Sequence, residues 1–493
     1  MKKVCLMIFD GWNHNEEKCD KDDIEIMPYP WISTLSTTFP SFMVHAHGEH
    51  VGLPPGQMGN REAGYITIGA GRVVEQDMVM IDKIIAEGKM GEYLDRAELV
   101  NKERVHLIGL VSDAGIYSHI DHLKSLVRNF KGRCKELYIH CIADGVDVEP
   151  RSFQVYLASL RECINEVGFG EIASLSGRKY SMSRGGELEK IKEYYNTIKC
   201  RGRFARSMSP EDYIKAQYEK GISDEFFRPR LFLEKGKIGV RDTVVFFNVR
   251  SYDIHEIVYS FIRDEHEVFI TVRVFESCEV GAIFSMARVE NGLDEVLSKK
   301  DLPQAQITDS KNSNLFYFFT GRLKDFSRGK MNFFGDERVY VYDPKLKMNT
   351  LKAVQTCMRV MKNNVQFIVC NFPPLDQIGY VRTCKEEPYR IVEEVDKAVG
   401  VLYEICRDND YTLVITADHV NSGYMRDING NLVEKRTIGK VPLIICSNEV
   451  KSKGCEERSV GTDYSLRDVA PTILHIMGIE IPPEMTGSSL VYK

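Results

Sequence analysis

The stretch VGLPPGQMGNREAGYITIGAG, residues 51–71, is the segment around which the rest of the chain is expected to be organised. It holds glycine at positions 52, 56, 59, 64, 69 and 71 and proline at positions 54 and 55. Glycine and proline at this density disfavour a regular helix or a central strand, so we expect a tight loop and then a short helix near Glu62. The polar turn at residues 59–62 would project from this loop into a site, although ordinary surface turns share the same composition.

Length and composition indicate a soluble globular protein of two or three domains. The chain has 493 residues, of which 43% are hydrophobic and 28% charged. A net charge of −6 argues against nucleic acid as a general electrostatic partner. The 13 cysteines include no CxxC pair, which favours reduced thiols and a cytoplasmic location. The apolar run Val4–Phe9 is too short for a signal peptide or a membrane span, so no membrane partner is expected.

Apolar runs alternate with segments of helical spacing along most of the chain. This alternation predicts an α/β fold with mainly parallel sheets. The predicted strands are 4–9, 105–111, 137–142, 172–175, 244–247, 268–274, 365–370, 412–416 and 441–446. The predicted helices are 119–130, 155–167, 352–361, a long helix from Pro388, and a last helix that opens at residues 468–472 and ends at Gly478.

Acidic residues follow three of the apolar strands. Asp10 follows the first strand, Asp376 lies in the loop after the 365–370 strand, and Asp418 and His419 follow the 412–416 strand. Ligands collect at the carboxyl ends of parallel strands. Carboxylates and a histidine gathered there predict a site for a hard metal ion or a phosphate, although acids are common in the loops of any α/β protein.

The glycine-rich stretch resembles the nucleophile loop of the cofactor-independent (2,3-bisphosphoglycerate-independent) phosphoglycerate mutases, which interconvert 3- and 2-phosphoglycerate in glycolysis. Further similar stretches are IFDGW, GLVSDAGIYSHIDHL, ADGVDVEP, GEIASLSGRKYSMSRG, FFNVRS, VITADH and EMTGSSL. The resemblance implies an alkaline-phosphatase-like domain with a second α/β domain inserted after the nucleophile loop. It places the phosphatase-like, metal-site domain at residues 1–72 and 290–493 and the inserted, substrate-binding domain at residues 73–289.

The resemblance also implies two manganese ions, but this chain matches only part of the ligand pattern. The matching positions are Asp10, Asp376, Asp418 and His419. Arg61 stands where the family has the serine that takes the phosphoryl group, and Tyr380 and Arg436 stand where it has histidines. We therefore expect no bound metal or other cofactor, with the two arginines pairing with the carboxylates in place of the ions.

The substrate-binding pattern is likewise retained in part. Its matching positions are Asp147, Arg178, Arg184, Arg250 and Lys311. Its replaced positions are Tyr117, for a histidine, and Val146 and Asp253, each for an arginine. Because several cations remain, a phosphorylated small acid or phosphate is the expected ligand, and the sequence identifies no protein partner.

The nucleophile position decides between the functions that the resemblance allows. Arginine stays protonated and cannot carry a phosphoryl group, so we expect a homologue without mutase activity that binds an anion or regulates another process. The alternatives are an active manganese-dependent mutase with compensating residues, and a phosphatase or sulfatase that uses another nucleophile. Thr67 and Ser112 are nearby hydroxyls in the sequence, but no pattern places them at the aspartates.

Overall fold

The computed structural model consists of two compact units. One comprises Met1–Gln76 and Arg288–Lys493, and the other comprises Asp77–Ala287. The structure describes all residues except 13–29, 183–187, 201–207, 251–253, 273–279, 285–287, 309–314, 322–328, 334–345, 373–385, 421–422, 427–431, 436–437, 448, 450, 453–462 and 493. In the described part, no helix is both long enough and apolar enough to cross a membrane.

The unit that contains both termini is built on a seven-stranded sheet. Its strand order is β11 (Gly329–Phe333), β10 (Gln304–Thr308), β12 (Phe367–Phe372), β1 (Lys3–Phe9), β13 (Tyr411–Ala417), β16 (Lys440–Cys446) and β2 (Ser41–His45). The first five strands are mutually parallel, and β16 is antiparallel to both of its neighbours. Because β1 lies in the middle and helices cover both faces, Val4–Phe9 are fully buried, which explains their continuous apolar sequence.

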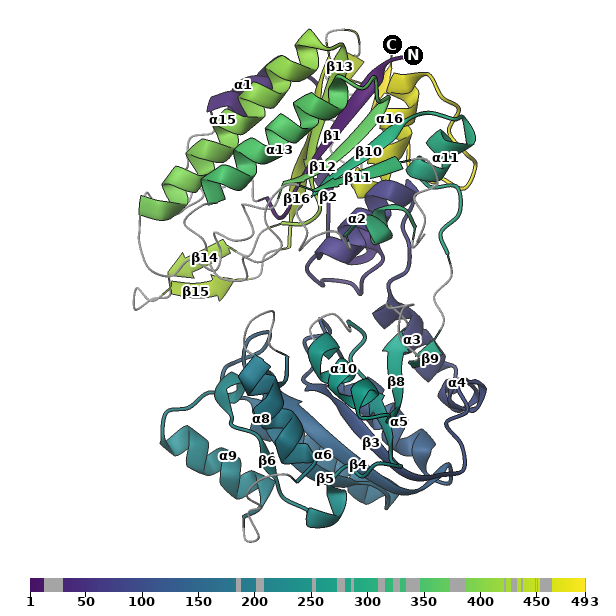
Figure 1. Ribbon diagram of the computed structural model, residues 1–493, viewed down its shortest axis with the longest axis vertical. Helices are drawn as coiled ribbons and strands as arrows, with labels where there is room; N and C mark the ends of the chain where they lie inside the picture. Colours follow the sequence, from purple (N-terminus) through teal and green to yellow (C-terminus); the bar gives the residue numbers. More distant parts are fainter. Residues whose placement is uncertain are drawn as a thin grey trace. The chain divides into compact units, whose positions relative to one another are not determined.

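Helices lie on both sides of this sheet. In Figure 1 the helices α1 (Pro30–Thr38), α13 (Leu346–Met361) and α15 (Glu386–Asp408) lie together on one side. The helices α2 (Arg61–Ala70), α11 (Leu293–Lys299) and α16 (Val469–Met477) lie on the other, and α12 (Leu315–Phe319) packs on α2. The long helix expected from Pro388 is confirmed but begins two residues earlier. The last helix ends at Gly478, whose φ of 72° caps it as predicted.

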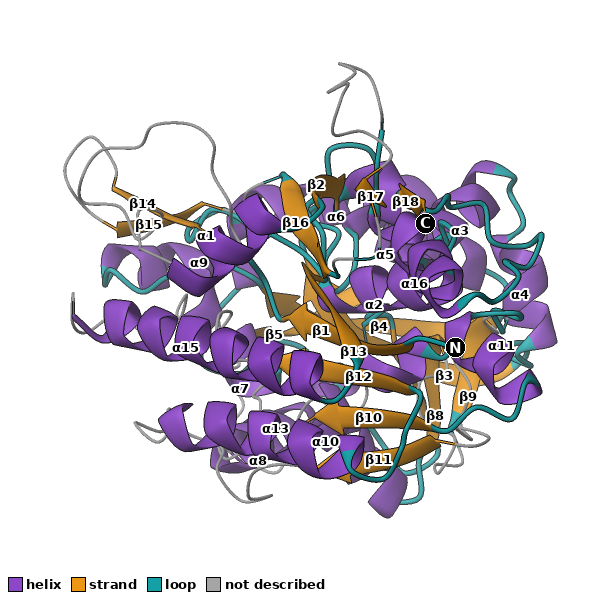
Figure 2. Cartoon of the chain, turned by 90° about the horizontal axis from the view of Figure 1, so that it is seen from above, coloured by secondary structure: helices purple, strands orange, loops and turns teal. Residues whose placement is uncertain are grey.

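The second unit has its own seven-stranded sheet. Its order is β6 (Arg230–Leu231), β5 (Glu171–Gly177), β4 (Cys134–Ala143), β3 (Lys102–Val111), β7 (Thr243–Phe246), β8 (Glu267–Val272) and β9 (Gly281–Phe284). All neighbours are parallel except β6, which is antiparallel to β5. Its helices are α3 (Asp77–Ala86), α4 (Met90–Arg96), α5 (Ile120–Phe130), α6 (Phe153–Val167), α7 (Arg178–Ser181), α8 (Leu188–Ile198), α9 (Pro210–Glu219) and α10 (His255–Arg263). The order of helices and strands along the chain confirms the predicted α/β class for both units, and Figure 2 distinguishes the two kinds of element by colour.

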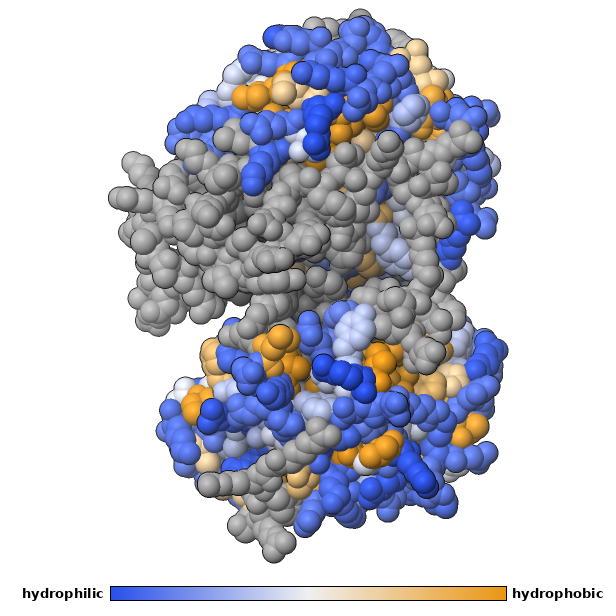
Figure 3. All heavy atoms as spheres, in the orientation of Figure 1, coloured by the Kyte–Doolittle hydropathy of each residue, from blue (hydrophilic) through white to orange (hydrophobic). Residues whose placement is uncertain are grey.

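Short elements complete the described chain. They are the 3-10 turns η2 (Gly48–Val51), η3 (Asp224–Phe226), η4 (Glu234–Gly236) and η7 (Leu466–Asp468), the hairpin of β14 (Gly423–Arg426) and β15 (Leu432–Lys435), and the pair β17 (Lys451–Ser452) and β18 (Val491–Tyr492). On the face drawn in Figure 3, hydrophilic residues cover most of the described surface and apolar residues occur in small groups. This distribution is typical of an ordinary protein surface.

The glycine-rich stretch forms a loop that leads directly into α2. The helix begins at Arg61, one residue before the expected start, and the Asn60 side chain caps it by accepting a hydrogen bond from the Ala63 N–H at 2.9 Å. Gly71 ends the helix with a φ of 61°, which favours glycine. The loop and the helix N-terminus therefore fix the backbone of position 61.

Candidate functional site

Two neighbouring strands deliver the acidic residues of the candidate site. Phe9 of β1 is paired with Ala417 of β13, so the residues that follow them, Asp10 and Asp418, leave the sheet at the same edge. The Asp418 N–H also donates to the Phe9 carbonyl at 3.2 Å. Parallel pairing of β1 and β13 therefore brings Asp10 and Asp418 to the same edge of the sheet, where the sequence led us to expect them.

Two glycines allow α2 and its loop to approach this edge. A Cβ at Gly64 would lie 2.1 Å from the carbonyl oxygen of Asp418, and one at Gly59 would lie 1.9 Å from the carbonyl oxygen of Ala46. Any side chain at either position would force the backbones apart. The glycines of this stretch therefore bring the first turn of α2, including Arg61, against Asp418.

Arg61 forms an ion pair with Asp10 at the centre of the site. Its Nε lies 2.7 Å from Asp10 Oδ1, and the two side chains are 24% and 1% exposed, respectively. The predicted pairing of a guanidinium with the buried carboxylates is therefore present for Arg61. The same prediction for Arg436 lies outside the described residues, as do the expected positions Asp376 and Tyr380.

His419 and Asp418 complete the described cluster. His419 Nε2 lies 3.4 Å from Asp10 Oδ1 and 3.6 Å from Asp418 Oδ1, and the Gly11 N–H donates to Asp418 Oδ1 at 3.0 Å. Burial raises the pKa of Asp418 to about 7, and the nearby Asp10 carboxylate acts in the same direction, whereas His419 and Arg61 oppose the shift. The cluster therefore carries one carboxylate that is costly to ionise without a further cation.

The donor atoms of this cluster fit one divalent ion. Asp10, Asp418 and His419 each offer a ligand atom, and these atoms lie within 4.8 Å of one another. The Oδ2 atoms of Asp10 and Asp418 are buried and have no hydrogen-bond partner among the described residues. Two carboxylates and an imidazole are suitable ligands for manganese, cobalt or zinc. The positively charged Arg61 side chain lies beside these ligands and would repel such an ion.

The predicted substrate-binding residues that the structure describes meet in the second unit. Arg178 follows β5, and its Nη1 lies 2.7 Å from Asp147 Oδ2 and 2.6 Å from Asp144 Oδ1. The guanidinium groups of Arg178 and Arg250 lie 4.8 and 5.3 Å, respectively, from the centre of the Tyr117 ring. Tyr117, which replaces the histidine of the resemblance, thus contacts both arginines through their cationic groups.

Sequence reasoning missed Asp144 as a partner of Arg178. Asp144 follows β4 in the way that Asp10 follows β1, so the strand-end signal that identified Asp10 was also present here. Its Oδ2 accepts a hydrogen bond from the Ser112 hydroxyl at 2.8 Å, which places that hydroxyl in the second unit. Of the remaining substrate positions, Val146 is 40% exposed, and Arg184, Asp253 and Lys311 lie outside the described residues.

Comparison with known proteins identifies the family. The family described as BPG-independent PGAM N-terminus (iPGM_N) matches residues 76–289. The 2,3-bisphosphoglycerate-independent phosphoglycerate mutase of Onchocerca volvulus is 33% identical over 521 residues, which span 100% of this chain and 99% of that protein. The chain belongs to the 2,3-bisphosphoglycerate-independent phosphoglycerate mutase family. The protein of the same name from Clostridioides difficile is 32% identical and covers the same shares of both chains.

A solved structure of a phosphoglycerate mutase has the same fold. The enzyme from Leishmania mexicana, crystallised at low cobalt concentration, superposes with a TM-score of 0.83 at 22% identity and covers 100% of this chain and 98% of its own. The fold is therefore an alkaline-phosphatase-like domain with an inserted α/β domain, as the resemblance implied.

The expectation that the protein uses no cofactor is wrong. The family to which the chain belongs uses two metal ions, and the similar Leishmania mexicana structure was obtained with cobalt. The replaced ligand positions do not remove every donor, because Asp10, Asp418 and His419 remain. Asp10, Asp418 and His419 converge on a site that one ion fits, so the arginine at position 61 does not by itself remove the donors.

Proposed function

We propose that this family member binds a phosphorylated small acid and has lost phosphoryl transfer through the residue at position 61. The observation that carries the proposal is the ion pair between Arg61 and Asp10, at 2.7 Å, in the place of the family's serine. A guanidinium has no lone pair available to attack phosphorus at neutral pH. The covalent intermediate that a nucleophilic residue would form therefore cannot form at Arg61.

A divalent ion held by Asp10, Asp418 and His419 would supply Lewis-acid stabilisation to a phosphoryl oxygen. Arg61 stands beside these donors and carries a permanent positive charge, so it can attract the same oxygens by charge-assisted hydrogen bonds. Binding of an anion would then be favoured even though the transferring group is missing. A non-catalytic or regulatory role, in the cytosol where the thiols stay reduced, is the function that we infer from this combination.

The second unit supports the choice of ligand. Arg178 and Arg250 flank one tyrosine ring, and arginine favours bidentate contact with carboxylate and phosphate groups. Two carboxylates already contact Arg178, which reduces the positive potential that it offers to an anion. We therefore expect weak binding of phosphate or of a three-carbon phosphorylated acid.

The retained carboxylate and histidine donors favour a second candidate, a metal-dependent phosphatase. Asp10, Asp418 and His419 would hold a divalent ion that would supply an activated water in place of the serine, so that hydrolysis of 3-phosphoglycerate would give inorganic phosphate and glycerate. This reaction and the mutase reaction are distinguished by their products from 3-phosphoglycerate, which are phosphate in one case and 2-phosphoglycerate in the other.

The test is to incubate the manganese- or cobalt-loaded protein with 3-phosphoglycerate and to follow all phosphorus species by 31P NMR. We expect neither 2-phosphoglycerate nor phosphate above a protein-free blank. In parallel, a thermal-shift titration should raise the unfolding midpoint, because a ligand at 100 times its Kd adds about 2.7 kcal/mol of stability. Absence of any shift with millimolar 3-phosphoglycerate and phosphate would contradict the anion-binding part of the proposal.

A further inference from the structure

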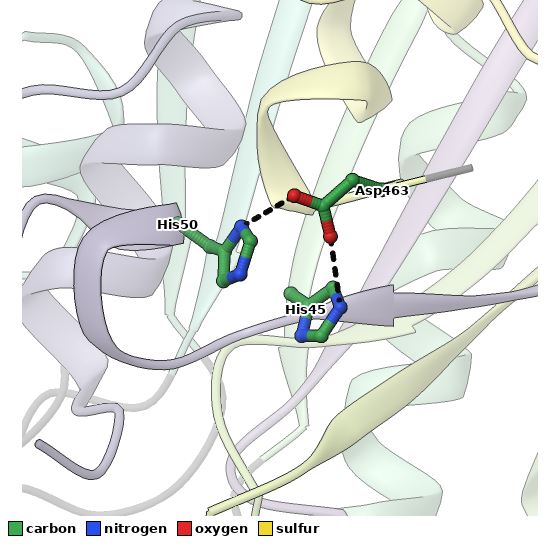
Figure 4. A group of neighbouring side chains, drawn as sticks. All are labelled: His45, His50 and Asp463. Carbon is green, nitrogen blue, oxygen red and sulfur yellow. Dashed lines mark ion pairs between the residues drawn. The ribbon is translucent and has the colours of Figure 1, made fainter. Parts of the chain in front are cut away.

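A second cluster of metal-ligand side chains lies in the unit that contains both termini. It consists of His45 at the end of β2, His50 in η2 and Asp463, two residues before Ser465 (Figure 4). His45 Nε2 lies 3.1 Å from Asp463 Oδ1, and His50 Nδ1 lies 3.6 Å from Asp463 Oδ2. The two imidazole rings are stacked, with centroids 4.0 Å apart, so both present a nitrogen to the same carboxylate.

Backbone contacts hold the three residues in place without help from their side chains. The His45 N–H donates to the carbonyl of Tyr464 at 2.8 Å, which ties the end of β2 to the segment that carries Asp463. Gly48, with a φ of 53°, turns the chain between the two histidines, and its N–H donates to the Gln57 carbonyl at 2.8 Å. The cluster is therefore arranged by the fold, as a binding site needs to be.

His47 provides the outer contact that ligand histidines usually have. Its Nε2 lies 3.3 Å from His45 Nδ1, the nitrogen that faces away from Asp463. When that contact is a hydrogen bond donated by His45 Nδ1–H, the Nε2 of His45 presents a lone pair toward the carboxylate. In that tautomer the Nε2 lone pair and the Asp463 carboxylate can bind one cation together, whereas in the other tautomer Nε2–H donates a hydrogen bond to Asp463 at the same 3.1 Å.

Both rings are only partly exposed, at 20% for the His45 side chain and 26% for the His50 side chain. Neutral imidazoles are the form that binds transition metals.

We propose that His45, His50 and Asp463 form a site for a divalent transition-metal ion such as zinc, separate from the Asp10 cluster and independent of the proposed function. Zinc–nitrogen and zinc–oxygen bonds of about 2.0–2.2 Å in tetrahedral geometry place ligand atoms about 3.3–3.5 Å apart. His45 Nε2 lies 3.1 Å from Asp463 Oδ1 and His50 Nδ1 lies 3.6 Å from Asp463 Oδ2, and one ligand atom from each of the three residues lies within 4.8 Å of the others. Three protein ligands leave one position for water, which suits the 61% exposure of Asp463.

An ion at this site would stabilise one conformation of the loop that leads to Arg61. The site joins β2 and η2 to the segment before η7, and Ala46, next to His45, lies against Gly59 of the loop. Binding there would stabilise the conformation of residues 46–59 and would not supply a reacting group. We therefore assign the ion a structural role.

The test is a zinc titration of the chelator-stripped protein in competition with a chromophoric chelator. It is run on the parent and on four variants, His50→Asn, Asp463→Asn, Asp418→Asn and His119→Asn. His119 is the matched control, because its Nδ1 lies 3.5 Å from Asp121 Oδ2 and the two side chains are 27% and 63% exposed, close to the 26% and 61% of His50 and Asp463.

We expect His50→Asn and Asp463→Asn each to lose one zinc equivalent, or to weaken it at least about tenfold. Asp418→Asn should keep that equivalent and His119→Asn should match the parent. Long-range 15N NMR of the parent should show that zinc moves the His45 and His50 imidazole nitrogens. Zinc binding by both His50→Asn and Asp463→Asn with the parent's stoichiometry and affinity would overturn the proposal, as would unmoved imidazole signals. Should His50→Asn not fold, the exposed Asp463→Asn decides alone.

Discussion

Replacing Arg61 by methionine tests whether its guanidinium compensates the buried Asp10. Asp10 is 1% exposed and Arg61 is 24% exposed, with 2.7 Å between the paired atoms. Breaking a fully buried pair costs about 3–5 kcal/mol, and breaking an exposed pair about 0–1 kcal/mol. Because one partner is partly solvated, we expect Arg61→Met to lower the free energy of unfolding by about 2–3 kcal/mol.

The assay is denaturant unfolding in the presence of a chelator, so that no ion can take the place of the guanidinium. Arg161→Met is the control, because Arg161 pairs with Glu211 at 2.6 Å and both side chains are at least 41% exposed. This variant should lose less than about 1 kcal/mol. If the two units unfold in separate transitions, the loss of unfolding free energy caused by Arg61→Met should occur in the transition of the unit that contains both termini.

A double-mutant cycle with Asp10→Asn separates the ion pair from lost packing. In the Asp10→Asn background, Arg61→Met should cost at least about 1 kcal/mol less than in the parent, because the uncompensated charge is gone. An equal loss in both backgrounds, or a loss within about 0.5 kcal/mol of zero in the parent, would refute the reasoning.

Three further predictions concern Asp294, Arg61 and Arg178. Burial raises the pKa of Asp294 to about 7, so its ionisation destabilises the fold and the free energy of unfolding falls as pH rises from about 4 to about 7. Asp294→Asn should remove up to about 4 kcal/mol of that fall, as measured by unfolding at a series of pH values. An unchanged slope of stability against pH would contradict this prediction. Arg61→Ser should tighten cobalt binding at the Asp10 cluster at least about tenfold in equilibrium dialysis, because a neighbouring positive charge is removed, yet should not restore mutase turnover, since Tyr380 and Arg436 remain. Arg178→Ala should abolish the thermal shift with 3-phosphoglycerate, whereas a shift equal to that of the parent would exclude Arg178 from the anion site.

Much of the first site could be predicted because its residues follow strands that are visible in the sequence. Val4–Phe9 and 412–416 are apolar runs long enough to identify as buried strands, and parallel pairing then brings Asp10 and Asp418 to one edge. The glycine-rich loop could be recognised in the sequence, so Arg61 could be predicted to lie beside these two carboxylates. Its pairing with Asp10 follows from the cost of burying a carboxylate alone.

Other features depend on tertiary contacts that local sequence does not encode. The contacts of Arg178 and Arg250 with the Tyr117 ring join the first residue of α7 to two loop residues that are far from it in the sequence. The cluster of His45, His50 and Asp463 joins residues more than 400 positions apart, and a lone aspartate in a polar segment gives no signal of its own. The strand β16 was predicted at 441–446, but its antiparallel direction was not, because a buried apolar run is compatible with either strand direction.

Turnover of 3-phosphoglycerate by the purified, manganese- or cobalt-loaded protein tests the central claim most directly. Formation of 2-phosphoglycerate is coupled through enolase and followed by absorbance, at protein concentrations high enough to detect a small residual rate, with a catalytically intact family member as the positive control. Because Arg61 occupies the nucleophile position, we predict a rate equal to that of the protein-free blank under both metals. A metal-stimulated rate clearly above the blank, which copurifies with the protein and is lost in Asp418→Asn, would contradict the claim.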